Sequence, residues 1–334
     1  PWGSIQYEHL QTLIGVLQQQ KHAHTTINAI ISAVRGTVKA AMGMKLMTAD
    51  DYQRLMLVKM TAGDDPFLKE YQALLDNTAY QGAPLEPVLS MDFEQVPPGG
   101  PADYLLQHGK LTLAPGAGVA GSTGLRAEYT GYHRGSERIV RRVALPEPGL
   151  EFSLNYDVKF EQDFQFVRGG KLLGLGPKKH ITGGKPIVPE GWSTRVMFKN
   201  EAGLKLYSYH QDMKGQYGER GDTKQPFSVE KERFYSVTLH VRVNDPPGAS
   251  NGFSRLYVDG QLIEQQENLR LRGTGGDETL INKFMFSSFH GGHEPDWAPK
   301  DEHGNYTTVH AIFDNISVYE GEHIRPQSGG ELPH

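Results

Sequence analysis

Two neighbouring segments place a serine, an arginine and two tyrosines at alternate positions. Ser193 and Arg195 alternate with largely apolar residues in the first segment, and Tyr207 and Tyr209 do so in the second. Alternation predicts β-strands, because positions i and i+2 of a strand share one face. The polar, glycine-containing link at 199–203 favours an antiparallel hairpin. A turn at its centre would set Arg195 opposite Tyr207 and Ser193 opposite Tyr209, on the face away from the core.

This polar face has groups suited to acid–base chemistry. An arginine binds a carboxylate through two parallel N–H donors. A tyrosine beside a cation can move protons, because opposite charge favours the phenolate over a phenol whose ordinary pKa is about 10. The combination indicates chemistry on an acidic substrate.

A glycine-rich segment at 168–175 lies just upstream and supplies Arg168 and Lys171. Its glycines allow the backbone to approach a bulky ligand closely. It is not a nucleotide-binding loop, since the GxxxxGK[ST] pattern is missing. Lys178 and Lys179 follow in a loop rich in glycine and proline, which could overhang the sheet and make the cleft locally positive. The alternative is that these lysines belong to a solvated loop.

From about residue 85 onward, short alternating runs are separated by turn residues. Asp259 and Gly260 mark a two-residue hairpin turn. No helical pattern interrupts the runs, which argues against a parallel βαβ fold. We therefore predict an all-β fold, an antiparallel two-sheet sandwich or jelly roll, over residues 85–322, followed by a flexible tail at 323–334. The predicted strands lie at 151–160, 234–244, 283–289 and 311–319, with the hairpin at 255–263.

Residues 1–80 show helical periodicity and precede the β-structure. Thr48–Asp51 forms a capping-box pattern, and Asp65–Pro66 predicts another helix start. We interpret this region as a small helical N-terminal domain or extension, with a role in oligomerisation or partner binding as the alternative. The apolar residues at helical spacing are Leu10, Leu13, Ile14 and Leu17, then Ile27, Ile30, Ile31 and Val34.

Composition limits the classes of function. The 334 residues suffice for one large domain and a smaller one. A formal net charge of −5 argues against general nucleic-acid binding, which leaves a basic footprint. The absence of cysteine excludes disulfides and thiolate metal sites, and no apolar run reaches the roughly 18 residues of a transmembrane helix. The start at Pro1–Ser4 lacks a signal-like segment, and we expect a secreted or periplasmic protein whose export signal has been removed.

Two histidine pairs are considered as metal ligands, His22 with His24, which we interpret as surface residues, and His290 with His293. Two glycines between the latter histidines do not direct both imidazoles to one point, and no nearby set of carboxylates completes a ligand shell. A tight loop between strands is the better interpretation. No calcium loop of the EF-hand type is present either, so we assign no metal site and expect no cofactor.

The motifs, taken in order, resemble polysaccharide lyase family 14, which contains alginate lyases and related polyuronate lyases. The resemblance covers roughly residues 90 to 320 and leaves out the helical region. It implies a β-jelly roll with an open cleft that cleaves uronate polymers by β-elimination. The motifs are Gly-Gly-Lys-Leu at 169–172, Trp-Ser-Thr-Arg-Val-Met-Phe at 192–198, Leu-Tyr-Ser-Tyr at 206–209, Tyr-Val-Asp-Gly at 257–260, Phe-His-Gly-Gly at 289–292, Trp297, and Phe-Asp-Asn at 313–315.

The family's functional lysine would correspond to Lys171, its Ser-x-Arg to Ser193 and Arg195, and its Tyr-x-Tyr to Tyr207 and Tyr209. In β-elimination a base removes the C5 proton of a uronate, and an acid protonates the leaving 4-O oxygen. The adjacent carboxylate must be neutralised, a role we expect for Arg195, with Ser193 positioning the substrate. Either tyrosine or a neutral Lys171 could be the base, and the sequence leaves these alternatives open.

Further substrate contacts are expected from Arg168, Lys178 and Lys179, and from His240 and Arg242 on the polar face of their strand. A solvated outer face is the alternative for the last two. Trp192 alternates onto the core side, which predicts packing rather than sugar stacking.

The expected substrate is an anionic polysaccharide, alginate first and glucuronan or another polyuronate next. A non-catalytic carbohydrate-binding jelly roll is the competing function, but it would need no proton-transfer pair. A hydrolase is less well supported, since it requires two carboxylates flanking the bond, and the predicted cleft face has no such pair. The oligomeric state is not predicted.

Overall fold

The computed structural model describes residues 5, 7–22, 24–44, 47, 52, 55, 56, 58 and 86–328. The chain divides into two compact units, Pro1–Pro84 and Leu85–His334. The helix starts predicted at Thr48–Asp51 and Asp65–Pro66 lie outside the described residues.

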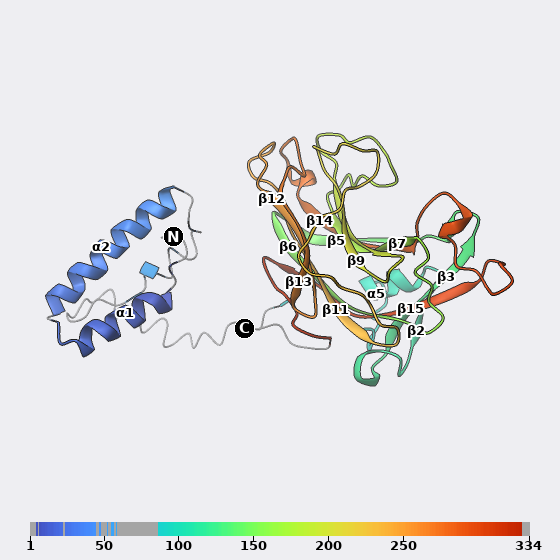
Figure 1. Ribbon diagram of the computed structural model, residues 1–334, viewed down its shortest axis with the longest axis horizontal. Coiled ribbons are helices and arrows are strands. Elements are labelled where there is room, and N and C mark those ends of the chain that lie inside the picture. Colours follow the sequence, from blue (N-terminus) through green and yellow to red (C-terminus); the bar gives the residue numbers. More distant parts are fainter. Residues whose placement is uncertain are drawn as a thin grey trace. The chain divides into compact units, whose positions relative to one another are not determined.

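The first unit contains the helices α1 (Tyr7–Gln19) and α2 (His24–Gly43), coloured blue in Figure 1. Their apolar stripes face a common small core, as helical periodicity requires. None of the described helices is long and apolar enough to cross a bilayer. The buried residues of this core are Leu10, Ile14, Leu17, Ile27, Ile31, Val38, Met47, Leu55 and Val58.

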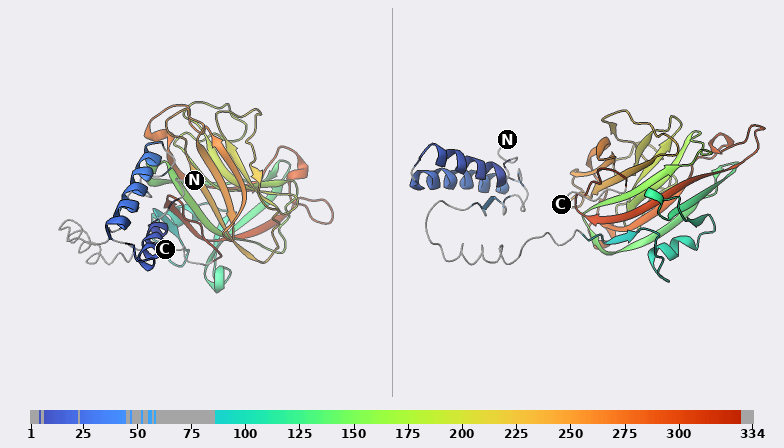
Figure 2. Two further views of the ribbon diagram at one scale, coloured as in Figure 1. Left: turned by 60° about the vertical axis from the view of Figure 1, so that its left-hand side comes forward. Right: turned by 90° about the horizontal axis from the view of Figure 1, so that it is seen from below.

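The second unit is built from two antiparallel sheets (Figure 1), seen from two further directions in Figure 2. The small sheet has the strand order β5-β14-β7-β8-β9 and the large sheet β10-β13-β12-β11-β6-β15-β3-β2, with β1 paired to β15 and β4 to β3. The small-sheet strands are β5 (Ile139–Gly149), β7 (Gly169–Gly176), β8 (Ser193–Lys199), β9 (Leu204–Tyr209) and β14 (Ile281–His290). The large-sheet strands are β1 (Leu89–Met91), β2 (Leu111–Ala114), β3 (Gly124–Tyr132), β4 (Gly135–Ser136), β6 (Glu151–Phe160), β10 (Asp222–Thr223), β11 (Phe234–Arg242), β12 (Gly252–Val258), β13 (Gln261–Leu269) and β15 (Thr308–Glu320).

One hydrophobic core joins the inner faces of the two sheets. Phe198 and Leu206 of the small sheet belong to the same buried cluster as Tyr156, Val237 and Phe313 of the large sheet. Side chains of alternating positions enter this core, as expected for a sandwich with one buried face per sheet. The all-β jelly-roll prediction is confirmed. A short helix, α5 (Pro101–Leu106), adds Ala102 and Leu105 to the core.

The β8–β9 hairpin has the register that its sequence predicts. Arg195 pairs with Tyr207 and Ser193 with Tyr209. The turn closes through the amide of Lys199, which donates to the carbonyl of Gly203 at 2.9 Å. The polar side chains therefore share the outer face of the small sheet, and the prediction of one common patch is confirmed.

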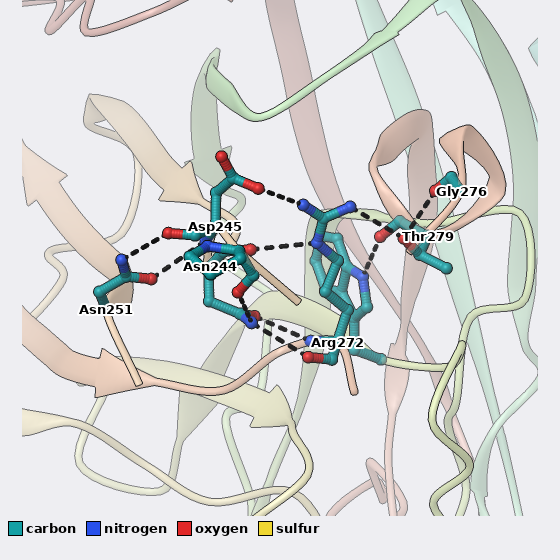
Figure 3. Close-up of polar contacts among 8 residues, drawn as sticks. Asn244, Asp245, Asn251, Arg272, Gly276 and Thr279 are labelled. Carbon is teal, nitrogen blue, oxygen red and sulfur yellow. Dashed lines mark hydrogen bonds and ion pairs between the residues drawn. The ribbon is translucent and has the colours of Figure 1, made fainter. Parts of the chain in front are cut away.

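A buried polar network fixes the start of β8 (Figure 3). Arg272 is 5% exposed and donates to Asp245 Oδ1 at 2.9 Å, to the Asn244 carbonyl at 3.0 Å and to Thr279 Oγ1 at 3.2 Å. The Thr279 carbonyl accepts the indole N–H of Trp192 at 2.8 Å. Trp192 is fully buried, which confirms that it packs in the core. Because it directly precedes β8, its anchoring determines where the polar face begins.

The segment after β15 lies against the large sheet. Arg325 is buried, and its Nη1 is 3.2 Å from Asp157 Oδ2. The carbonyl of His323 accepts a hydrogen bond from Asn155 Nδ2 at 3.0 Å. Our sequence prediction is a flexible tail from residue 323, whereas these bonds hold the chain to the sheet as far as Arg325. Residues 329–334 lie outside the described residues.

Candidate active site

Lys171, Arg195 and Tyr207 meet on the outer face of the small sheet. Lys171 Nζ lies 4.1 Å from the centre of the Tyr207 ring, and Arg195 Cζ lies 5.5 Å from it. The Tyr209 ring is edge-on to the Tyr207 ring, with ring centres 5.6 Å apart. The hydroxyl oxygens of the two tyrosines are 3.5 Å apart. The structure thus brings together all four residues that we predicted to be catalytic.

An irregularity in β7 makes this meeting possible. The pairing of β7 with β8 shifts between Lys171 and Gly174, so that the lysine and the glycine both face outward. A side chain on Gly174 would collide with the carbonyl of Thr194 and with Cγ of Arg195. Glycine at this position therefore lets the arginine cross over β7 toward Ser287, whose Oγ accepts from its Nη1 at 3.4 Å.

Lys171 is a strong candidate for a base because it is buried among cations. Lys171 is only 9% exposed. Burial, followed by the charges of Arg195, Lys199 and Arg138, lowers its pKa from 10.5 to about 7. A large fraction of Lys171 is therefore the neutral amine near neutral pH, the form that can accept a proton.

Tyr207 has the opposite tendency. Burial, together with its tyrosine neighbour, raises the pKa of Tyr207 above the ordinary value near 10. Arg195 acts in the other direction, but its effect is smaller than that of burial. Arg195 favours the phenolate, as the sequence predicted, but burial outweighs it, so this side chain is a neutral phenol that can donate a proton.

Arg195 carries a buried charge without a carboxylate partner in the described part of the chain. It is 2% exposed, and its Nε is buried with no hydrogen-bond partner among the described residues. Burial and the cations Arg138 and Arg142 lower its pKa, while Tyr207 and Tyr209 raise it. An uncompensated buried cation is costly, and such groups are concentrated at functional sites. The geometry and charge fit the binding of an anion.

A loop between β7 and β8 covers one end of this polar face. Ser193 Oγ donates to the carbonyl of Ile181 at 2.5 Å, and the amide of Gly184 donates to the Tyr209 hydroxyl at 3.0 Å. The side-chain amide of Gln211 also holds this loop in place, since its Nε2 donates to the carbonyls of Val188 and Gly191, both at 3.1 Å. The prediction that this loop overhangs the sheet is confirmed.

Ser193 itself does not have the free hydroxyl expected of a substrate contact. It is fully buried, and its donor is used by the Ile181 carbonyl. The serine therefore positions the covering loop instead of meeting the substrate directly.

We expect Ser193→Ala to lower the free energy of unfolding by about 1 kcal/mol, since it leaves one buried carbonyl unpaired. Turnover should fall less than tenfold, because no reacting atom is lost. Urea denaturation and steady-state kinetics would check both values. A loss comparable with that of a Lys171 variant, in a protein that is fully folded, would contradict the positioning role.

The family of the chain follows from its sequence match. A family model, Polysaccharide lyase 14, matches residues 141–309, just over half of the chain. The chain belongs to polysaccharide lyase family 14. It is therefore a polysaccharide lyase, and the prediction of an enzyme is confirmed. Among curated proteins none matches the chain.

Solved structures share the fold of this family 14 lyase. A mutant of alginate lyase Aly36B in complex with alginate tetrasaccharide is 23% identical, with a TM-score of 0.52, over 60% of this chain and 82% of that one. The PL-14 alginate lyase from Aplysia kurodai is 21% identical, with a TM-score of 0.51, over 70% and 99%. Alginate lyase vAL-1 from Chlorella virus is 17% identical, with a TM-score of 0.54, over 70% and 100%.

The three basic residues that we predicted as further substrate contacts, Arg168, Lys178 and Lys179, lie at the surface around the lyase site. Arg168 is exposed, pairs with Glu294 at 2.8 Å and lies 5.3 Å from the centre of the Trp297 ring. Lys178 and Lys179 are exposed on the covering loop, and Lys179 is paired with a glutamate, Glu190. These exposed side chains are not part of the buried cluster of Lys171 and Arg195.

His240 and Arg242 lie on the other sheet of the lyase, so our interpretation of them as substrate contacts in this cleft is not supported. Both belong to β11 of the large sheet. His240 is fully buried, and its Nε2 is 2.8 Å from Glu151 Oε1. Arg242 Nε lies 3.7 Å from Glu151 Oε2. Alternation correctly placed both on a polar face, but it could not identify the sheet.

Sequence reasoning missed Arg138, Arg142 and His180, whose charges or rings surround the site. Arg138 precedes β5 and lies 4.8 Å from the centre of the Phe289 ring. Burial, followed by Arg142 and other cations, lowers the pKa of His180 to about 4, so it is neutral. The Arg-Arg pair at 141–142 was a visible signal, but β5 was not among the predicted strands.

His290 and His293, which the sequence suggested as a metal pair, lie in different environments in the structure. His290 is buried, and its Nε2 is 2.6 Å from the Gln165 carbonyl, whereas His293 is exposed beside Arg134. A different group, Glu161, Asp163 and His310, has ligand atoms within 4.8 Å of one another. Its glutamate is already paired with Arg126 at 2.8 Å and its histidine is 2.6 Å from the aspartate. No metal is assigned to either group.

Proposed function

We propose that this lyase cleaves a 4-O-linked polyuronate, with alginate as its substrate. The observation that carries the proposal is Arg195, a buried arginine without a carboxylate partner among the described residues, beside Lys171 with its lowered pKa. A uronate carboxylate is an anion that such an arginine would bind, and beside that carboxylate the uronate has the C5–H that β-elimination removes. The alginate lyases that share the fold support alginate over other polyuronates.

The first step of the proposed reaction is removal of the C5 proton. Arg195 binds the adjacent carboxylate and stabilises the negative charge that develops there as the C5–H bond breaks. Neutral Lys171 accepts the proton and becomes the ammonium. Its lowered pKa makes this form available, and the Tyr207 ring 4.1 Å away stabilises the cation once it is formed.

The second step breaks the glycosidic bond. The electron pair from C5 forms a double bond to C4, and the C4–O bond breaks toward the leaving sugar. The leaving oxygen needs a proton, and the phenol Tyr207, whose pKa is raised by burial, is protonated at all physiological pH values. Tyr209, 3.5 Å from Tyr207 between hydroxyl oxygens, can return a proton to it from the covered end of the site. The products are a chain with an unsaturated uronate at its new non-reducing end and a leaving chain with a new reducing end.

The experiment for this proposal is an ultraviolet assay of purified protein. The unsaturated uronate absorbs strongly, so absorbance should rise with alginate, and comparison with polymannuronate, polyguluronate and glucuronan would give the preference. No rise with any of the four polymers would refute a polyuronate substrate. A rise with glucuronan alone would correct the proposal from alginate to that polymer.

The partner of the protein is thus a soluble anionic polysaccharide. A secreted or periplasmic location is part of the proposal, because polymers of this size are met outside the cytoplasm. Detection of the native protein in culture medium or periplasmic extract would check it.

A further inference from the structure

A groove of about 810 Å³ opens at the turn end of the β8–β9 hairpin. It lies beyond the residues assigned to catalysis, where β8 ends at Lys199 and the turn leads to β9. Three of its lining residues are cations, Lys199, Lys205 and Arg220. Pro226 and Phe227 give it an apolar side.

The groove has more positive charge than its surroundings neutralise. Lys205 is 3.7 Å from the buried Glu264 and donates to Thr223 Oγ1, so its charge is partly balanced. Lys199 and Arg220 form no ion pair with any carboxylate in the described part of the chain. Glu201, exposed at the turn, is the one acidic residue in the described lining. Two cations are therefore available to an incoming anion.

The groove and the catalytic cluster are parts of one face. Arg195 and Lys199 both point outward from β8, as Tyr207 and Lys205 do from β9, because each pair is separated by an even number of residues. The four residues from Arg195 to Lys199 span roughly 13 Å of strand. That distance exceeds one sugar ring, so a carboxylate held at Lys199 cannot belong to the uronate held at Arg195.

The apolar side of the groove is fixed in place. Phe227 is half-buried, and its ring packs edge-on against Tyr235 at 5.4 Å between ring centres. Sugar rings present a C–H face that packs on such surfaces, while fixed charges nearby determine orientation. The groove thus combines an apolar wall, formed by Pro226 and Phe227, with the cations Lys199 and Arg220.

We propose that this groove is a distal subsite, in which Lys199 and Arg220 bind the carboxylate of another uronate of the chain being cleaved. The inference rests on the proposed function, since it assumes a polyuronate substrate. A carboxylate bound there would hold a long chain in register with Arg195, but an oligomer too short to reach Lys199 would gain nothing. The subsite therefore predicts a dependence of the reaction on chain length.

The test is the double variant Lys199→Gln/Arg220→Gln, assayed on size-fractionated oligouronates and on the polymer. We expect kcat/KM for the polymer and long oligomers to fall about tenfold, equivalent to about 1.4 kcal/mol. The shortest oligomer that is cleaved should react at the wild-type rate when assayed at about pH 9, where Lys171 is neutral with or without the charge of Lys199, which helps to lower its pKa. A matched control, Lys231→Gln/Arg126→Gln, removes the same charge outside the small sheet, from the exposed Lys231 and from the part-buried Arg126, and it corrects for general attraction of the polyanion.

Three results would overturn the subsite. Equal losses on short and long substrates would show that the two cations act on the catalytic cluster or on folding. Unchanged kinetics on every substrate, or losses matched by the control variant, would show that they do not bind the chain.

A direct binding measurement separates this inference from the proposed function. If the wild-type protein cleaves no polyuronate, the proposed function fails, and calorimetric titration with the same oligouronates still tests the groove. Tighter binding of long oligomers that the double variant abolishes would then support a polyuronate-binding groove without cleavage. Length-independent binding, or none, would reject the groove as well.

Discussion

Lys171→Ala is expected to lower kcat/KM on polyuronate by about 10²–10⁴-fold, the usual contribution of a positioned general base. The reason is that Lys171 combines burial, proximity to Arg195 and a pKa lowered to about 7. Tyr207, by contrast, has its pKa raised by burial and is a neutral phenol. The ultraviolet assay on alginate would measure the loss.

The pH dependence gives a second measure of the same residue. Lys171 must be neutral to accept the C5 proton, so kcat/KM of the wild type should rise with pH and level off above an apparent pKa of about 7. In the complex the substrate carboxylate favours the ammonium, so the corresponding limb of kcat should lie at higher pH. The residual activity of Lys171→Ala should lack this limb. A wild-type profile that is flat from pH 6 to about 9 would contradict Lys171 as the base.

Stability distinguishes a lost base from a lost fold. The unfolded lysine binds its proton up to about pH 10.5 and the folded one only up to about 7, so the wild type loses stability as pH falls between these values. Lys171→Met removes the buried amine, and we expect it to raise the free energy of unfolding near pH 7 by on the order of 1–4 kcal/mol. The exposed Lys231→Met is the matched control, which should change neither activity nor stability.

The hairpin register was predictable because it depends on local information. Period-two alternation assigns Arg195 and Tyr207 to one face, and a short link with glycine leaves few ways to pair the strands. The same alternation correctly predicted that Trp192 packs in the core. Turn length and side-chain period together determine the pairing before any long-range contact is considered.

The rest of the site depends on contacts that the sequence does not encode locally. Lys171 faces Tyr207 because β7 lies between β8 and β14 in the sheet, and the irregularity that follows the lysine places Gly174 opposite Arg195. Its burial, and therefore its lowered pKa, could not be read from its own neighbours in sequence. That burial outweighs Arg195 at Tyr207 could not be predicted for the same reason, since the charge of nearby cations was visible in the motifs but the desolvation was not.

His240 shows the limit of a face assignment. Its strand alternates as clearly as β8 does, yet β11 lies in the large sheet, where the polar face is turned away from the core and carries the Glu151 contact. Strand order is a long-range property that depends on which edges pair. A polar strand face therefore predicts a surface but not the identity of the ligand-binding surface.

Arg195→Met is expected to lower kcat/KM on polyuronate by about 10²–10³-fold, comparable with the loss of a group that stabilises developing charge. The folded state should not suffer, because the substitution removes a buried charge that has no carboxylate partner among the described residues. Arg195→Lys keeps the charge but loses the two-pronged donor, and an intermediate loss is expected. Thermal unfolding of both variants would confirm that they are folded.

The role of Arg195 can be isolated by changing the substrate instead of the enzyme. A methyl-esterified polyuronate has no carboxylate charge to neutralise, and its C5 proton is more acidic without the arginine. If Arg195 acts by neutralising the carboxylate, the ratio of wild-type to Arg195→Met rates should shrink at least tenfold on the esterified polymer. The same ratio for Lys171→Ala should be nearly unchanged, because the proton must still be removed. Equal losses on free and esterified polymers would assign Arg195 to positioning of the sugar, since a group that neutralises charge matters only where the charge is present.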